Sequence, residues 1–247
     1  MRATLQLDGL VAAPGTGPVG VLVQPGELVA VVARPPVGTA LARVVLGLAA
    51  PLAGRVRVGG RDVTALPPAG RQVGYVPAGG GLLPHLSVRS NIGYGQRRRE
   101  EVHAVIDEWI DTVVDRLELA PSLRLLPHQL NEAQRFRVAL ARAAAGLPEV
   151  LVVDLPAPAD GADRLPELLS RIAPRDSAGV AALACLADTV ALDGVTRRVA
   201  VPAAGDAAPP PDAPAPPAGN PAPPAGNPAP LADDPGPPAA DAGPVDR

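Results

Sequence analysis

Lysine is absent from the chain of 247 residues, in which all 22 basic side chains are arginine. This absence excludes Schiff-base chemistry and a phosphate-binding loop of the usual lysine-containing kind. Cysteine occurs once, at Cys185, and the three histidines are scattered, which argues against a disulfide framework and against a zinc or histidine metal cluster. Aromatic residues make up only 2% of the chain, so stacking platforms for single-stranded nucleic acid are not expected.

The chain has no large excess of charge of either sign: it contains 22 basic and 25 acidic residues, and the net charge is -3. This balance argues neither for nor against nucleic acid, and with so few aromatic residues we expect no nucleic-acid partner. Charged residues interrupt every apolar stretch before the roughly 20 residues that a membrane-spanning helix needs. The N-terminus lacks the apolar run of a signal peptide. We therefore expect a cytoplasmic protein, with a peripheral position on the inner face of the cell membrane as an option that requires a partner.

Proline is concentrated at the end of the chain, with 15 prolines among the 45 residues from 203 to 247 and the sequence APPAGNP repeated twice. Such a segment donates few backbone hydrogen bonds and has little large apolar surface to bury. We predict a folded domain at 1–202 and a disordered Pro/Ala/Gly-rich tail at 203–247, with polyproline II character. A solvated spacer and a docking ligand for a proline-binding partner both remain open for the tail.

Strand-like and helix-like segments alternate through the first 202 residues. Short β-branched or fully apolar runs predict strands at 19–23, 28–33, 55–58, 72–76, 150–153, 180–186 and 199–201. Helical spacing of apolar residues, with Asn131 as a helix cap, predicts helices at 39–48, 100–117, 131–145 and 165–172. The apolar face of the first helix is expected to comprise Leu41, Val44, Val45 and Leu48. This alternation is typical of an α/β domain with a partly parallel sheet.

Several motifs occur in an order and spacing known from one family. They are GRDVTALPP at 60–68, LLPHLSVRSNI at 82–92 and QRFRVALARA at 134–143. Over about residues 3–201 the chain resembles an ATP-binding-cassette (ABC) transporter ATPase, and most of all the import subunits that serve iron, polyamines or molybdate. The resemblance implies a P-loop NTPase-like α/β fold with a mixed sheet, and a helical subdomain at about 87–147. It also implies ATP and Mg²⁺ as cofactors, with a transmembrane permease and a second ABC ATPase subunit, in a homo- or heterodimer, as partners.

The phosphate-binding loop departs from the family pattern, which is Gly-x-x-x-x-Gly-Lys-Ser/Thr after a strand and before a helix. Residues 33–40 read ARPPVGTA, which is one residue shorter and lacks the lysine. Gly38 and Thr39 match the pattern, so the resemblance implies that they bind nucleotide. Pro35 and Pro36 have no N–H groups for a phosphate. A plain turn from strand to helix is the alternative reading of this segment.

Two further residues match functional positions of the family. Gln134 ends the segment LNEAQ, which stands where the family has the signature LSGGQ, so the resemblance implies a nucleotide contact. Asp154 follows the apolar run 150–153 and matches the carboxylate that binds magnesium, although a structural loop-capping role is equally open. Catalytic groups are absent from their expected positions: the adenine-stacking aromatic, the sensor glutamine, the general-base glutamate and the switch histidine correspond to Pro14, Ala78, Leu155 and Ala187.

Two functions of different class follow, and whether the chain is an enzyme stays open. The first is an ATP-binding-type transporter subunit that couples to a permease, with weakened nucleotide binding and lost hydrolysis. The second is a non-catalytic pseudo-ATPase scaffold or decayed paralogue without a transport role. The loop at 77–86, with glycines at 79–81, and Trp109 are expected to form the permease-docking surface. The alternative is that Leu82, Leu83 and Leu86 are core residues.

Overall fold

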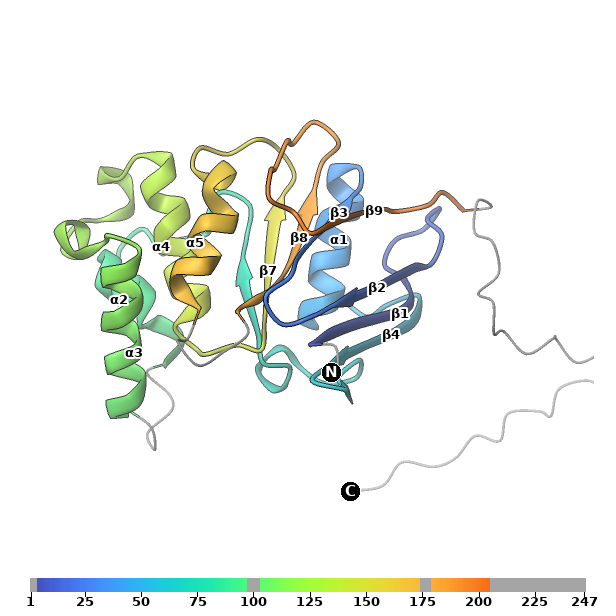
Figure 1. Cartoon of the computed structure of the whole chain (residues 1–247), viewed down its shortest axis with the longest axis horizontal. Coiled ribbons are helices and arrows are strands. Elements are labelled where there is room, and N and C mark those ends of the chain that lie inside the picture. The colour runs from blue at the N-terminus through green and yellow to red at the C-terminus, as the bar shows by residue number, and fades with distance from the viewer. Residues whose placement is uncertain (1–3, 97–102, 174–178, 205–247) are drawn as a thin grey trace, which may run out of the picture. The chain divides into compact units, whose positions relative to one another are not determined.

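The computed structural model describes residues 4–96, 103–173 and 179–204 (Figure 1). These residues belong to the first of two compact units, Met1–Ala208, and the second unit is Pro209–Arg247. The predicted disordered tail therefore lies outside the described residues from position 205 onward. Among the residues that are described, no helix has the length and apolar character needed to cross a bilayer.

A five-stranded sheet forms the centre of the fold, and all its strand pairs are parallel, where the alternation of segments predicts a partly parallel sheet. Its strand order is β6-β7-β8-β3-β9. Both β7 and β8 are buried at all six positions, which explains why their sequences are apolar apart from Asp154 of β7. The strands are β3 (Leu28–Val32), β6 (Val73–Val76), β7 (Val150–Leu155), β8 (Ala181–Leu186) and β9 (Arg197–Ala200).

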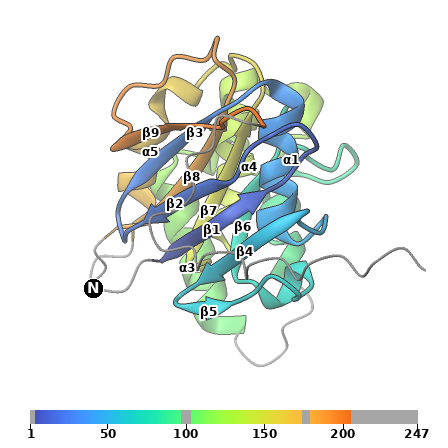
Figure 2. The same cartoon turned by 90° about the vertical axis from the view of Figure 1, so that its right-hand side faces the viewer.

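A second, antiparallel sheet has the order β2-β1-β4-β5 and lies in front of the parallel sheet in Figure 2. The sequence did not predict β1, the first strand of this sheet in chain order. The reason is a bulge at Gly9, where φ is +57° and the pairing register shifts between Leu7 and Leu10, so the alternation of buried residues is interrupted. The strands are β1 (Leu5–Val11), β2 (Val19–Val23), β4 (Ala53–Val58) and β5 (Arg61–Asp62).

Helices cover both faces of the parallel sheet (Figure 1). On one face, α1 (Pro35–Leu46) packs between the two sheets in one apolar cluster. The opposite face is covered by four helices in a second cluster, and these include most of the predicted helical subdomain. They are α2 (Val88–Ile92), α3 (His103–Arg116), α4 (Glu132–Ala144) and α5 (Leu165–Ile172).

The predicted helix ends agree with the structure for α4 and α5 and differ for α1. Asn131 caps α4 as predicted, and α5 spans the predicted residues. In contrast, α1 begins at Pro35 instead of Thr39 and ends at Leu46. The prediction that Leu48 lies on its buried face is wrong: Gly47 adopts φ +78° and ends the helix, which leaves Leu48 51% exposed.

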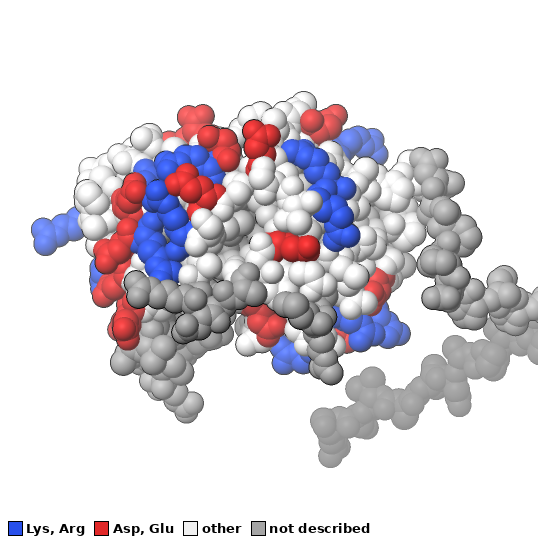
Figure 3. Space-filling model, viewed as in Figure 1, with Lys and Arg blue, Asp and Glu red and all other residues white. Residues whose placement is uncertain are grey.

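The helices of the second face are joined by reciprocal arginine contacts. Arg116 of α3 donates to the carbonyl oxygens of Arg171 and Ala173, and Arg171 of α5 donates to Glu118 and to the Arg116 carbonyl oxygen. Arg171 also pairs with Glu167 at 2.8 Å. Basic and acidic side chains are intermixed over this face in Figure 3. These bonds hold the end of α3 against the end of α5.

Candidate functional site

The connection between β3 and α1 consists of only two residues, Ala33 and Arg34. Arg34 is the N-cap of α1, with φ -57° and ψ 142°, and its side chain makes no capping hydrogen bond. Pro35 and Pro36 occupy the first two helical positions, where a fixed φ and a missing N–H are tolerated. The two prolines therefore convert the segment where a phosphate-binding loop is expected into the first turn of a helix.

The backbone amides of this turn are not available to a ligand. The N–H groups of Val37 and Gly38 both donate to the carbonyl oxygen of Arg34, at 2.9 and 3.0 Å. Pro35 and Pro36 have no N–H to offer. Because a phosphate cradle requires free N–H groups that point at the anion, residues 35–38 do not form one in this conformation.

Gly38 lies inside α1 and does not adopt a positive φ. A methyl group at this position would meet Cβ of Cys185 at 3.7 Å, an ordinary van der Waals distance. Neither backbone conformation nor crowding therefore requires glycine here. The assignment of Gly38 to nucleotide binding stays a prediction.

The structure brings Thr39 and Asp154 into direct contact. The Thr39 hydroxyl donates to Asp154 Oδ2 at 2.9 Å and lies 3.2 Å from Oδ1. The hydroxyl of Tyr75 on β6 donates to the same Oδ2 at 3.4 Å. Tyr75 was not singled out from the sequence, because its place near Asp154 depends on the pairing of β6 with β7, in which Tyr75 is the partner of Val152. We call these three residues the hydroxyl–carboxylate cluster.

Asp154 is the buried member of the hydroxyl–carboxylate cluster, whereas Thr39 and Tyr75 are half-buried. Asp154 is 2% exposed, and burial raises the pKa of its carboxyl group, although the hydrogen bonds from Thr39 and Tyr75 oppose the shift. Burial and the nearby Asp154 charge raise the pKa of Tyr75 to about 12. Burial also raises the pKa of the neighbouring Cys185 thiol. The Asp154 carboxyl group is thus held by the hydroxyl groups of Thr39 and Tyr75.

The hydroxyl–carboxylate cluster contains two of the residues that the sequence motifs assign to a magnesium nucleotide. Thr39 and Asp154 are oxygen ligands of the type that Mg²⁺ prefers. However, the Thr39 hydroxyl hydrogen points at the Asp154 carboxylate, and residues 35–38 provide no phosphate cradle. Within the described ranges, no group of three or more His, Cys, Asp or Glu side chains could hold a metal ion. In this arrangement the residues do not fit a magnesium nucleotide.

Gln134 belongs to a separate arrangement at the start of α4. Asn131 Oδ1 accepts from the Gln134 N–H at 2.8 Å, and Gln134 Oε1 accepts from the Asn131 N–H at 3.0 Å. This reciprocal pair is a capping box, which satisfies donors that a helix N-terminus otherwise leaves free. Glu132, in the same turn, is exposed and lines a small hollow of about 80 Å³ together with Asp154.

The predicted adenine side lies beside the end of the described chain. Thr16 and Ala203 form an isolated antiparallel bridge, and the Gly17 N–H donates to the Pro202 carbonyl oxygen at 2.8 Å. The Ala204 N–H donates to the Gly15 carbonyl oxygen at 3.2 Å. Residues 203 and 204, placed in the tail by composition, thus make backbone bonds to the domain. The adjoining cavity of about 220 Å³ is lined by Gly15, Thr16, Ala33, Arg34, Val37, Val201, Pro202 and Ala203.

The loop after β6 is held in place by two side chains that the sequence did not reveal. Gly79, Gly80 and Gly81 all have positive φ, which favours glycine at each position. Arg142 of α4 donates to the carbonyl oxygens of Gly80 and Gly81, both at 2.8 Å. Burial lowers the pKa of the Arg142 guanidinium.

Asn91 of α2 holds the second half of this loop and is 0% exposed. Its side-chain amide accepts from the Leu83 N–H at 2.8 Å and donates to the carbonyl oxygens of Leu83, Leu86 and Ser87. Leu83 and Leu86 are half-buried, so neither the docking role nor the core role predicted for them is excluded. An ordinary asparagine in a short helix gives no sequence signal of such a role.

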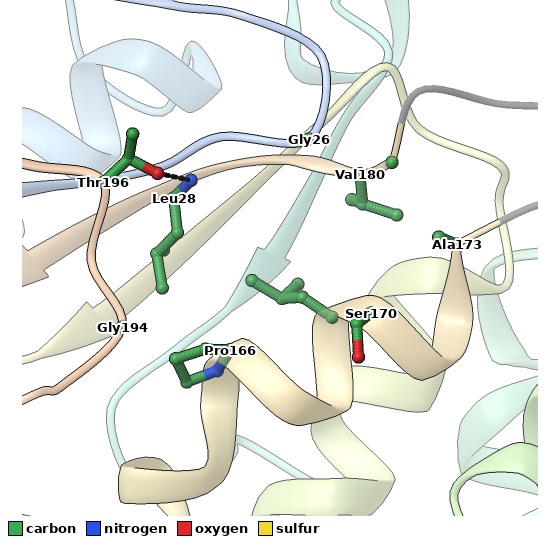
Figure 4. Close-up of a pocket in the computed structure, with 10 residues that line it drawn as sticks. Gly26, Leu28, Pro166, Ser170, Ala173, Val180, Gly194 and Thr196 are labelled. Atoms are coloured by element: carbon green, nitrogen blue, oxygen red, sulfur yellow. Dashed lines mark hydrogen bonds between the residues drawn. The ribbon is translucent and has the colours of Figure 1, made fainter.

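Two larger hollows lie elsewhere on the domain, and the first of them shares Tyr75 with the hydroxyl–carboxylate cluster. One, of about 730 Å³, runs beside β6 and is lined by Gln72, Tyr75, Gln96, Arg142, Leu147 and neighbours. The other, of about 460 Å³, lies between α5 and the segments before β3 and β9 (Figure 4). Its two hydroxyl groups are engaged within the chain: Ser170 donates to the Glu167 carbonyl oxygen, and Thr196 accepts from the Leu28 N–H. Among the described residues that line this second hollow, none has a charged side chain.

Comparison with known sequences gives a family match and several relatives. A sequence model of a family described as ABC transporter matches residues 17–157. The putative 2-aminoethylphosphonate import ATP-binding protein PhnT of Salmonella typhimurium is 36% identical over 140 residues, 56% of this chain and 38% of that protein. The spermidine/putrescine import ATP-binding protein PotA of Frankia alni is 35% identical over 146 residues, 59% of this chain and 31% of that protein. Each match therefore spans less than half of the relative.

Comparison with solved structures supports the fold. The structure of cbiO1 from Clostridium perfringens, part of the ABC transporter complex cbiONQ, matches with a TM-score of 0.61 at 18% identity and covers 75% of this chain and 79% of that one. A structure described as the ATP binding subunit of an ABC transporter matches with the same score and identity and covers 75% and 80%. These matches confirm the predicted α/β fold class.

Proposed function

Because the chain belongs to the ABC transporter family, we propose that it acts as the ATP-binding-type subunit of a membrane transporter, with weak nucleotide binding and no ATP hydrolysis. The observation that carries the proposal is the start of α1 at Pro35. The amides that would surround a phosphate are either absent or bonded to Arg34 within the helix. Gly38 and Thr39 contribute at most a weak nucleotide contact, and Gln134 and Asp154 act first as hydrogen-bond partners of their own chain.

The loss of hydrolysis is supported by two apolar residues. Leu155 stands where the family has its general base and is 3% exposed, and Ala187 stands where the family has a histidine and is 2% exposed. Neither side chain can accept a proton from water. Since a positioned general base contributes about 10²–10⁴ to a rate, nothing at these positions replaces that contribution.

A permease partner is supported by the surface around β6 and the loop that follows it. The groove of about 730 Å³ beside β6 combines apolar Tyr75 and Leu147 surface with the polar groups of Gln96 and Arg142. The neighbouring loop is fixed by Arg142 and Asn91. Trp109 of α3 is fixed as well, because its side-chain N–H donates to the Ala144 carbonyl oxygen of α4 at 3.0 Å. We infer that a permease segment docks in this groove and holds the chain peripherally at the inner face of the membrane.

The transported cargo is not assigned, because the relatives carry names that refer to different cargos. A scaffold without a transport role is the second candidate. It is favoured by the hydroxyl–carboxylate cluster, in which Asp154 is already satisfied by Thr39 and Tyr75 without any ligand. The two candidates differ in whether a permease is required for the function.

The test measures binding of Mg²⁺-ATP by the purified full chain, alone and co-expressed with a permease from the same operon. We expect the permease to co-purify, nucleotide binding to be weak and ATP turnover to stay at background. A Leu147→Arg variant should lose permease retention while it keeps its fold, because Leu147 lines the groove and is 45% exposed. Turnover well above background would contradict the loss of hydrolysis, and unchanged retention of the Leu147→Arg variant would contradict docking in the groove. Failure of the unaltered chain to retain a permease favours the scaffold.

A further inference from the structure

Residues 201–204, which we call the strap, follow β9 and lie against the loop between β1 and β2 (Figure 1). Two backbone hydrogen bonds tie the strap to that loop. The Gly17 N–H donates to the Pro202 carbonyl oxygen at 2.8 Å, and the Ala204 N–H donates to the Gly15 carbonyl oxygen at 3.2 Å. Elements held by so few bonds open locally while the rest of a domain stays folded.

The strap forms one wall of the cavity of about 220 Å³ beside the start of α1. The other walls come from the loop between β1 and β2 and from residues 33, 34 and 37. Among the described residues that line the cavity, Arg34 alone has a charged side chain. Pockets that enclose small organic ligands usually measure about 300–1,000 Å³, so the cavity is too small for a nucleoside while the strap is in place.

Gly17 is buried against the strap and has no room for a side chain. A methyl group there would lie 3.0 Å from Pro202 Cγ and 3.1 Å from the Ala203 carbonyl oxygen. The φ of Gly17 is not positive, so the close approach of the strap, and not the backbone conformation, requires glycine. Gly20, which is exposed on β2, is the opposite case, because a methyl group there would meet no atom within 4 Å.

We propose that the strap is an autoinhibitory element, which keeps nucleotide out of the cavity beside Arg34 while it is bonded to the loop and admits nucleotide when it detaches. This regulation rests on the proposed function, since it acts on the weak nucleotide binding inferred above. When only a fraction of the molecules is open, the apparent dissociation constant is the intrinsic constant divided by that fraction. Nucleotide binding is then weak because the strap is closed as well as because α1 begins at Pro35.

A disulfide across the strap tests the proposal in the full chain. The two backbone bonds flank Thr16 and Ala203, which therefore form a non-hydrogen-bonded antiparallel pair. The Cα atoms of such a pair are about 4.5 Å apart, a separation that a disulfide can span. The variant Thr16→Cys/Ala203→Cys should close with oxidised glutathione and open with dithiothreitol. Cys185 is 1% exposed and should not compete.

Equilibrium dialysis with Mg²⁺-ATP measures the effect of the disulfide. The oxidised double variant should bind about tenfold or more weakly than the same protein after reduction, because the disulfide removes the open fraction. The two single-cysteine variants, Thr16→Cys and Ala203→Cys, are the controls and should not respond to dithiothreitol.

Release of the strap is tested by Gly17→Ala, with Gly20→Ala as the matched control. Gly17→Ala should bind Mg²⁺-ATP about tenfold more tightly than the unaltered chain, because the added methyl group displaces the strap. Gly20→Ala should leave the affinity unchanged. Hydrogen exchange of the Ala204 amide reports detachment directly and should be faster in Gly17→Ala alone.

Equal affinity of the oxidised and reduced forms, or tighter binding by the oxidised form, would overturn the proposal. Faster exchange of the Ala204 amide in Gly17→Ala without a gain in affinity would also overturn it, since the strap would then only stabilise the domain. So would an absence of ATP binding in every variant. Permease retention by the unaltered chain separates the two proposals: retention with an affinity that does not depend on the strap would refute autoinhibition and leave the proposed function intact.

Discussion

The polar groups around α1 and those around the loop after β6 differ in what they bond to. Around α1, side chains and amides that could face a ligand bond to their own chain, as in the hydroxyl–carboxylate cluster. Around the loop after β6, Arg142 and Asn91 hold the backbone in a defined shape while the adjoining groove stays open. The comparison shows that the polar groups of the hydroxyl–carboxylate cluster are engaged within the chain, whereas the fixed loop after β6 borders an open groove.

Removal of Asn91 should have the largest effect. Asn91→Ala leaves the Leu83 N–H and three carbonyl oxygens without their partner inside the fold. Unsatisfied buried groups cost about 1–3 kcal/mol each, and partial relaxation of the loop makes a total loss of about 3 kcal/mol the expected result. Urea unfolding monitored by circular dichroism measures it. A loss below about 1 kcal/mol would show that Asn91 does not hold the loop. Asn131→Ala, which removes an exposed cap whose side chain accepts one hydrogen bond, serves as a comparison.

Repair of the phosphate loop tests the other side. Residues 34–38 are replaced by a glycine-rich segment one residue longer that places a lysine before Thr39. This change restores amide donors and charge together, so ATP affinity should increase by about 10²-fold, equivalent to about 2.7 kcal/mol. Isothermal titration calorimetry measures the affinity. Hydrolysis should stay near background, and adding Leu155→Glu should give only slight turnover. A folded, repaired protein that binds no ATP would place the defect elsewhere, for example on the side of Pro14.

Truncation distinguishes the domain from the proposed tail. Removal of residues 205–247 should leave stability unchanged, because it retains every backbone bond made by residues 201–204. Removal of residues 201–247 deletes the bonds to Val32, Gly15 and Gly17, and at about 0.5–1.5 kcal/mol each it should cost about 2 kcal/mol. Thermal unfolding of the two truncated chains measures the difference. Equal stability would show that residues 201–204 do not contribute to the domain.

Thr39→Val should lower the free energy of unfolding by about 1.5 kcal/mol, the lower end of the range for a hydrogen bond to a charged group.

The contribution of Asp154 to stability should depend on pH. Because burial raises the pKa of Asp154 in the fold, the folded state binds its proton more tightly than the unfolded state does. The contribution of Asp154 to stability is therefore largest at acid pH and falls as the pH rises from the unfolded value of about 3.9 through the folded value.

Asp154→Asn provides the control for this pH dependence. The stability of the unaltered chain relative to Asp154→Asn should decrease as the pH rises through that window, and urea unfolding at several pH values measures it. A difference that is flat with pH would mean that burial does not shift the Asp154 pKa. An increase with pH would mean that the hydroxyl hydrogen bonds outweigh burial.

Sequence reasoning predicted the fold well and the site only in part. Fully apolar runs such as 150–153 and caps such as Asn131 act locally, so their structures follow from neighbouring residues. The bulge at Gly9 hid β1, and the fixing of a loop by Arg142 depends on residues about 60 positions apart in the chain. The missing lysine was visible in the sequence. The start of α1 at Pro35 was not visible, because Pro35 and Pro36 are compatible with both a loop and a first helical turn.

The smallest predicted effect is also the most direct test of how α1 begins. In this structure Gly38 is an ordinary helical residue with room for a methyl group, so Gly38→Ala should stabilise the fold by about 0.5–1 kcal/mol. Gly47→Ala is the matched control: Gly47 has φ +78°, and a methyl group there would lie 2.5 Å from Arg71 Nε, so it should destabilise. Thermal and urea unfolding measure both variants. If Gly38→Ala also destabilises by more than about 1 kcal/mol, the backbone at Gly38 is not helical and the phosphate loop has kept a conformation that only glycine adopts.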